Sequence, residues 1–321
     1  MTKKLRKKKK TSGKSRTQKT QLKKAVSGLL FLIVLVLLAG LLAHQLVLRR
    51  SSIQSLKPSV KSLASKKTAH KIPVYEIYPE KEIHHKKSIA EPKPYLTTEL
   101  PKVAIIIDDI GYDRIIAEKF LNLDAVLTFS LLPHSLFQDK IAREAHEKGF
   151  ETMLHLPLEP LEYPSVDPGP GTLLISMSPD ELIIQLNKNL DAIPFIKGVN
   201  NHMGSKMTTS STQMYQIFSI LKKRKLFFID SLTTSETLCK PSARLLQVPF
   251  AQRDVFIDHI QDPDFIRKQI DLLIHIAHRD GEAIGIAHPH IITYNILREL
   301  LPELQKKVQL VPASTIVRIP S

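Results

Sequence analysis

From about residue 99 to the C-terminus, short apolar runs alternate with amphipathic helical patterns. This alternation is typical of βα units built around a parallel sheet. Strands are predicted at residues 103–107, 126–131, 152–156, 198–201, 226–229, 255–257 and 283–286, with a late run at 308–311. Seven or eight such units in this length of chain favour a (β/α) barrel, with an open doubly wound sheet as the alternative.

Two helix starts are well marked between the predicted strands. Ser178, Pro179 and Glu181 form a capping box with proline at the first helical position. Asp262, followed by a proline, opens a second helix that Gly281 closes. These signals place helices between the predicted strands, as expected for βα units.

The first predicted strand, residues 103–107, ends in two adjacent carboxylates, Asp108 and Asp109, followed by Gly111. Like charges side by side ionise at a cost unless a cation or a hydrogen-bond donor lies between them. The carboxyl ends of parallel strands are also where catalytic groups collect. The pair therefore suggests a site. The alternative is that one aspartate caps a helix starting near Tyr112 and the other is solvated.

Polar residues also lie at or near the carboxyl ends of other predicted strands. They are His155, Glu159, Asn201, His202, Asp230, Ser231, His288 and His290. In a barrel these ends converge on one mouth, within reach of a single cation. Zn²⁺ takes three nitrogen or oxygen ligands and keeps one position open for water. Asp109, His155 and His202 could supply them, with Glu159 as an alternative ligand.

The basic charge is concentrated at the N-terminus. Residues 1–24 hold 12 of the 46 Lys and Arg and no acid, so the remainder of the chain is nearly neutral. A nearly neutral main domain argues against nucleic-acid binding, which concentrates Lys and Arg on one face.

An uncharged run at residues 25–43 is dominated by Leu, Val and Ile. Its length matches the hydrocarbon thickness of a bilayer, and it predicts one N-terminal transmembrane helix that serves as an uncleaved signal anchor. By the positive-inside rule, a basic tail at 1–24 stays cytoplasmic and the anchor occupies 25–48. A flexible linker at 49–98 then leads to a domain at 99–321 on the non-cytoplasmic side of the inner membrane.

The motifs IIIDDIG, MLHLPLEP, DPGPGTL, GVNNHMGS, FFIDS, RDVFID and IGIAHPH together resemble the divergent polysaccharide deacetylase family, which is related to NodB-type carbohydrate esterases. The resemblance runs from about residue 101 to the C-terminus. It implies a distorted (β/α)7 barrel and metal-dependent removal of N-acetyl groups from an amino-sugar polymer such as peptidoglycan. It also implies that Asp108 is the base and Asp109 a metal ligand.

The sequence departs from the family pattern at several positions. Related deacetylases have a second histidine four residues after the first, where this chain has Glu159. They also have an arginine that orients the base, where this chain has the segment Asn201 to Gly204; Arg253 is the predicted replacement. A basic residue common after the Asp-Ser of the fifth strand is Leu232 here.

The predicted mechanism uses a divalent metal, with Zn²⁺ expected, to polarise the acetyl carbonyl and activate water. Asp108 accepts a proton from that water and His288 protonates the leaving amine. Substrate contacts are assigned to Asn201, Asp230, Ser231, Arg253 and His290. Two alternatives remain: a catalytically inactive, membrane-anchored barrel that binds glycan or protein, and a metal-dependent cell-wall amidase.

Overall fold

The computed structural model describes residues 99–321. The predicted tail, signal anchor and linker lie outside the described residues, so their boundaries stay predictions. Within 99–321, no helix combines the length and apolar character needed to cross a membrane.

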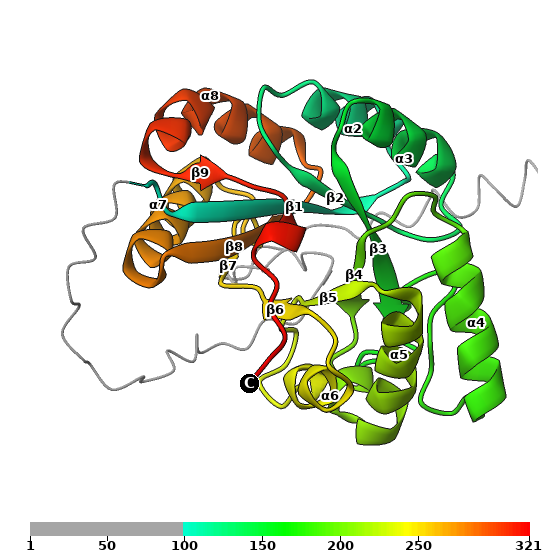
Figure 1. Ribbon diagram of the computed structural model, residues 1–321. Helices are drawn as coiled ribbons and strands as arrows, with labels where there is room; N and C mark the ends of the chain where they lie inside the picture. The colour runs from blue at the N-terminus through cyan, green and yellow to red at the C-terminus, as the bar shows by residue number, and fades with distance from the viewer. Residues whose placement is uncertain (1–98) are drawn as a thin grey trace, which may run out of the picture. The chain divides into compact units, whose positions relative to one another are not determined.

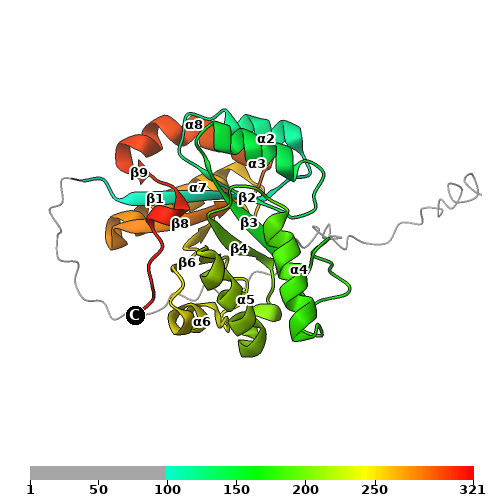
Figure 2. The same cartoon turned by 45° about the vertical axis from the view of Figure 1, so that its right-hand side comes forward.

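A curled sheet of parallel strands forms the centre of the domain, and helices cover its outer face (Figures 1 and 2). The strands are β1 Lys102–Ile110, β2 Thr128–Leu131, β3 Glu151–Leu158, β4 Gly198–Met203, β5 Phe227–Asp230, β6 Phe250–Gln252, β7 Val255–Phe256, β8 Glu282–Ala287 and β9 Gln309–Leu310. The helices are α2 Arg114–Leu121, α3 Gln138–Glu147, α4 Pro179–Asp191, α5 Ser211–Arg224, α6 Cys239–Leu246, α7 Pro263–Asp280 and α8 Ile291–Lys307.

The expected barrel is not fully closed. The strand order is β6-β5-β4-β3-β2-β1-β8-β7, with β9 added beside β1, so β6 and β7 are the two ends of the ladder. The peptide between them crosses the seam: Arg253 N donates to Asp230 O at 3.0 Å, and Asp254 N donates to Ile284 O at 2.9 Å. The prediction of a distorted parallel-strand α/β barrel is therefore confirmed in part: the strands form a curled half-barrel, and residues 253 and 254 join its two ends by backbone hydrogen bonds.

Two hydrophobic cores lie on the two faces of the sheet. The outer core packs the helices against the strands. The inner core lies on the concave face; it contains Ala104, Ile106, Met153, Phe227, Ile229, Phe256, Ile284, Ile286, Val311, Ala313 and Ile316. Val311, Ala313 and Ile316 come from the C-terminal segment after β9. That segment fills the amino end of the curl and leaves the carboxyl ends of the strands on the other side.

The predicted helix starts are confirmed. Ser178 and Glu181 make both hydrogen bonds of the capping box, and Asp262 accepts from Phe265 N at 2.9 Å. The helix after β1 is capped by Asp113, whose side chain accepts from two backbone N–H groups of its first turn. The alternative in which Asp108 or Asp109 caps this helix is therefore wrong.

Gly198 gives a test of the inner core. A Cβ at this position would lie 2.3 Å from the ring of Phe227, its cross-strand partner on β5. Overpacking of this kind usually costs roughly 1–3 kcal/mol. We expect Gly198→Ala to lower the free energy of unfolding by about that amount in urea denaturation. The double variant Gly198→Ala, Phe227→Leu should recover part of the loss, and equal stability of the single variant and the wild type would contradict this account of the packing.

Candidate metal centre and active site

The candidate site is the polar layer directly above the inner core, at the carboxyl ends of the strands. Residues two apart on a strand face the same side. On β1, Ala104 and Ile106 belong to the inner core and Asp108 follows at the next inward position; on β3, Met153 is followed by His155. The pattern recurs with Gly198 below Asn200 and His202, Ile229 below Ser231, and Ile286 below His288.

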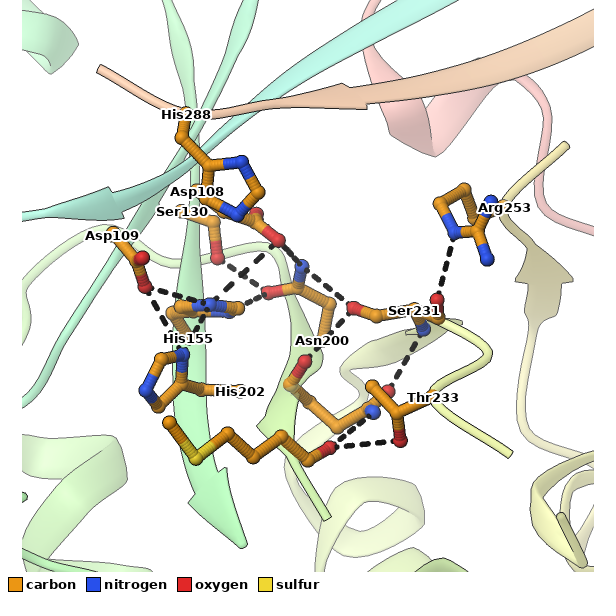
Figure 3. A network of polar contacts seen from close by, with 12 residues as sticks. Asp108, Asp109, Ser130, His155, Asn200, His202, Ser231, Thr233, Arg253 and His288 are labelled. Atoms are coloured by element: carbon orange, nitrogen blue, oxygen red, sulfur yellow. Dashed lines mark hydrogen bonds and ion pairs between the residues drawn. The ribbon is translucent and has the colours of Figure 1, made fainter. Parts of the chain in front are cut away.

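Asp109 joins this layer because the backbone turns at that residue. Neighbouring residues in a regular strand point to opposite faces, so Asp108 and Asp109 could not both face the site in an undistorted β1. Asp109 has φ +54°, and the pairing of β1 with β2 shifts register between Ile107 and Ile110. The left-handed turn brings the Asp109 carboxylate beside His155 and His202 (Figure 3).

Three ligand-type atoms meet at this point. His202 Nδ1 lies 3.0 Å from Asp109 Oδ1, His155 Nε2 lies 3.2 Å from the same oxygen, and the two nitrogens are 3.1 Å apart. Atoms bound about 2.0–2.2 Å from one cation in octahedral or tetrahedral geometry lie roughly 2.8–3.6 Å from one another. The three separations therefore fit the ligands of one metal ion.

Asp109 Oδ1 supports this fit independently. The atom is buried, and among residues 99–321 it has no hydrogen-bond partner. The two imidazole nitrogens lie 3.0 and 3.2 Å from it and 3.1 Å from each other, which is within hydrogen-bond distance. A buried carboxylate oxygen that makes no hydrogen bond within the described part of the chain and lies beside two imidazole nitrogens fits a position where a cation would bind.

Asn200 connects the metal ligands to Asp108. Its Oδ1 accepts from Ser130 Oγ and lies 2.9 Å from His155 Nδ1. Its Nδ2 donates to Asp108 Oδ1 at 2.8 Å and to Asp108 Oδ2 at 3.0 Å. A proton on His155 Nδ1 satisfies the amide oxygen and leaves Nε2 with its lone pair toward Asp109 and His202.

The two neighbouring carboxyl groups have opposite pKa shifts. Burial raises the pKa of Asp108 from its ordinary value, although His155, His288 and Asn200 counteract part of the rise. Burial acts on Asp109 in the same sense, but His202 and His155 outweigh it and hold the pKa of Asp109 well below its usual range. Burial also opposes the charged form of His155, yet Asp108 and Asp109 raise the pKa of that imidazole to about 9. Environments that separate the pKa values of paired groups mark different chemical roles.

His288 enters from the other side of Asp108 and is held by Asp258 (Figure 3 shows His288). Asp258 Oδ1 lies 2.8 Å from His288 Nδ1, while Asp258 Oδ2 accepts from His288 N at 2.7 Å and from Thr293 Oγ1 at 2.7 Å. Burial disfavours the Asp258 carboxylate, but His288 and these donors lower its pKa.

Asp258, His288 and His290 form a second group with metal-ligating atoms. Both Asp258 oxygens already hold His288 and Thr293, and His290 Nε2 lies 3.1 Å from Gln261 Nε2. This arrangement fits an oriented imidazole better than a second metal centre. His290 is half-buried next to His288, with ring centroids 5.9 Å apart.

The structure does not bring Glu159 to the three-atom group. Its Oε2 accepts from Ile175 N at 2.6 Å and its Oε1 pairs with Lys206 Nζ at 2.6 Å. These contacts join the two ends of the long connection between β3 and α4 and link it to the segment after β4. The predicted metal position of Glu159 is therefore corrected: this carboxylate anchors a loop.

Two other predicted site residues have structural partners. Asn201 points away from the Asn200 side of β4; it accepts from Ser231 N at 2.8 Å and donates to Met203 O at 2.8 Å. Asp230 is fully buried and accepts from Leu232 N and from Thr237 Oγ1, both at 2.9 Å. Both side chains shape the connections after β4 and β5.

Ser231 and Arg253 lie at the edge of the network in Figure 3. Ser231 Oγ donates to Asn201 O at 2.8 Å and lies 3.4 Å from Asn200 Nδ2. Arg253 Nε donates to Ser231 O at 2.8 Å, and its guanidinium lies 3.7 Å from the centre of the Phe256 ring. Arg253 thus bridges the seam between β5 and β7, while the amide that holds both oxygens of Asp108 comes from Asn200.

Three residues of the site were not predicted from the sequence: Ser130, Asn200 and Asp258. Strand alternation could have found Asn200, because it lies two positions before His202 and therefore shares its face. Asp258 lies two positions after Phe256, a residue of the inner core, and could have been found by the same alternation. Ser130 is a single polar residue between Phe129 and Leu131 on β2.

Comparison with known proteins gives consistent results. A model of the divergent polysaccharide deacetylase family matches residues 105–317. An uncharacterized Escherichia coli protein, YibQ, is 34% identical over 219 residues, which cover 68% of each chain. An uncharacterized Haemophilus influenzae protein is 28% identical over 210 residues, covering 65% of this chain and 74% of its own.

Among solved structures, an uncharacterized protein of Agrobacterium tumefaciens aligns with a TM-score of 0.66 at 25% identity, covering 70% of this chain and 93% of that chain. The family match spans the whole candidate site, from the carboxylates at the end of β1 to the histidines after β8. The resemblance seen in the sequence motifs is confirmed, and the chain belongs to the divergent polysaccharide deacetylase family.

Proposed function

We propose that this protein is a metal-dependent hydrolase that removes N-acetyl groups from an amino-sugar polymer of the cell envelope. The observation that carries the proposal is the convergence of three ligand atoms, the Asp108 carboxylate and the Asp258-bound imidazole of His288 on one site. Metal-assisted amide hydrolysis uses these parts: a cation, a base for water and an acid for the leaving amine. Membership in the family supports an amino-sugar substrate.

Asp109, His155 and His202 would hold the metal, with Zn²⁺ proposed because the donor set is two imidazoles and one carboxylate. When bound, such an ion polarises a carbonyl and lowers the pKa of water. The low pKa of Asp109 keeps that ligand ionised. In the tautomer with the proton on Nδ1, facing the Asn200 amide oxygen, His155 Nε2 has its lone pair for the metal; because the pKa of His155 is raised to about 9, metal binding would displace a proton from Nε2.

Asp108 accepts the proton of the attacking water. The Asn200 amide fixes its carboxylate, and burial raises its pKa, so it is a stronger base than an exposed aspartate. His288 donates a proton to the leaving nitrogen. Because Asp258 faces His288 Nδ1, the ring presents Nε2 to the substrate. His290, half-buried next to His288, is proposed as a substrate contact.

The proposed location is the non-cytoplasmic side of the inner membrane, with residues 25–48 as the anchor. The support is the apolar run at 25–43 and the basic block that precedes it. A domain tethered there would meet cell-wall glycan.

Metal binding can be tested on the purified full-length chain without any substrate. We expect about one equivalent of Zn²⁺ per chain, by elemental analysis and calorimetry. Asp109→Ala and His202→Ala should reduce it to near zero because each removes one of three ligands. Glu159→Gln is the matched control and should keep the full equivalent, since this carboxylate binds a loop. Full zinc content in both ligand variants would remove the metal centre from the proposal.

Catalysis can be tested by mass analysis of peptidoglycan fragments and N-acetylglucosamine oligomers. Loss of one acetyl group is the expected change; a cleaved peptide stem would indicate an amidase, and unchanged fragments a binding barrel.

Variants then assign the roles of the acid and the base. Asp108→Asn and His288→Gln should lower kcat roughly 10²–10⁴-fold, the usual contribution of a general base or acid. Asp258→Asn should lower kcat without lowering zinc content, because it disturbs only the orientation of His288. His275→Gln, on the exposed side of α7, serves as control. Wild-type rates in Asp108→Asn would exclude Asp108 as the base.

A further inference from the structure

We infer that Asn200 is a positioning residue that serves both halves of the site: its amide oxygen sets the metal-binding tautomer of His155, and its amide nitrogen holds Asp108 as the base. The inference rests on the proposed function, because Asp108 has a role as a base only in that reaction. It goes beyond that function because it assigns to one side chain two effects that can be measured separately, one on metal affinity and one on the catalytic rate.

The surroundings of Asn200 determine which way its amide points. The side chain is fully buried. The oxygen end faces Ser130 Oγ, which donates to it, and His155 Nδ1 at 2.9 Å. Within residues 99–321, the nitrogen end donates to three acceptors: both oxygens of Asp108 and, at 3.4 Å, Ser231 Oγ. A reversed amide would place its oxygen against the carboxylate and leave the nitrogen facing donors, at the cost of several buried hydrogen bonds.

The oxygen end acts on metal binding. An acceptor 2.9 Å from His155 Nδ1 favours the tautomer with the proton on that nitrogen. His155 Nε2 then directs its lone pair toward the point shared with Asp109 Oδ1 and His202 Nδ1. Partners that orient a ligating histidine typically contribute 10–100-fold to metal affinity.

The nitrogen end acts on the base. Asp108 Oδ2 is only 3.7 Å from His155 Nε2, so a small rotation of the carboxylate would bring it among the metal ligands. Asn200 Nδ2 contacts both Asp108 oxygens, at 2.8 and 3.0 Å, and opposes that rotation. Asn200 thereby keeps Asp108 beside the ligand group and available to accept a proton.

The two ends can be separated with nearly isosteric variants of the full-length chain. Asn200→Asp keeps an acceptor for His155 and Ser130 but has no N–H group for Asp108, which it repels. We expect its zinc affinity to stay within about threefold of wild type and its kcat to fall roughly 100-fold or more, with little change in KM. Asn200→Ala loses both ends, so its zinc affinity should also fall roughly 10–100-fold.

Two controls address folding. Asn200→Leu fills most of the volume that Asn200→Ala leaves empty and should show the same loss of zinc affinity. Asn189→Asp places a carboxylate at another buried asparagine, on α4, whose partners are His134, Gln185 and Gly171. It should leave zinc affinity and kcat unchanged. Thermal unfolding of each metal-free variant measures the cost to the fold separately.

The inference is overturned if Asn200→Asp loses as much zinc affinity as Asn200→Ala and Asn200→Leu, or if Asn200→Asp retains the wild-type kcat. Failure of the proposed function gives a different result: the wild-type chain would bind zinc and release no acetate. In that case the difference in zinc affinity between Asn200→Asp and Asn200→Ala still decides whether the oxygen end sets the His155 tautomer.

Discussion

The site depends on the alternation of side chains in a curled parallel sheet. On the concave face, the middle of the sheet is apolar, with Ala104, Ile106, Met153, Ile229, Ile284 and Ile286, and the same face becomes polar at the carboxyl ends of the strands. The inner core therefore determines where along the strands the polar side chains begin and that these side chains point to the concave face. One local exception completes it, the left-handed turn at Asp109 (φ +54°), which adds a second carboxylate from β1. A non-glycine residue with positive φ is uncommon, and its occurrence beside a buried charge cluster fits strain retained for function.

The separation of roles between Asp108 and Asp109 follows from their neighbours. Asp108 remains on the regular strand, deep in the curl and facing an amide, so burial dominates its pKa. Asp109 turns toward two imidazoles and stays ionised. Two chemically identical neighbours thus acquire different properties because the backbone changes direction between them. The glycine after Ile110 continues the turn with φ +142°, and a Cβ there would collide with Ser135.

Much of the fold could be predicted from the sequence. All eight predicted runs overlap strands, and the last of them contains the short β9. Strand β6 was missed because Phe250–Gln252 has only three residues and little apolar pattern. The open seam could not be foreseen, since it depends on how residues 253 and 254 bond to β5 and β8.

At the site, Asp109, His155 and His202 were predicted together, as was His288 close to Asp108. Glu159 was wrongly predicted as a ligand because it lies just after β3, where the direction of a side chain no longer follows from its spacing to His155. Asn201 was predicted in place of Asn200 because the alternation of side chains along β4, which puts Asn200 and His202 on one face, was not taken into account.

The segment after β9 has a consequence for the site although it lies on the opposite side of the inner core. Val311, Ala313 and Ile316 are buried in the inner core beneath β1, β3 and β8, and Arg318 pairs with Phe250 on β6. The last described segment therefore completes a core that begins with β1, the first strand of the domain. A variant without Val311, Ala313 and Ile316 would expose the apolar floor of the curl to water, so the geometry of the polar layer above that floor depends on a segment that contributes no side chain to the site.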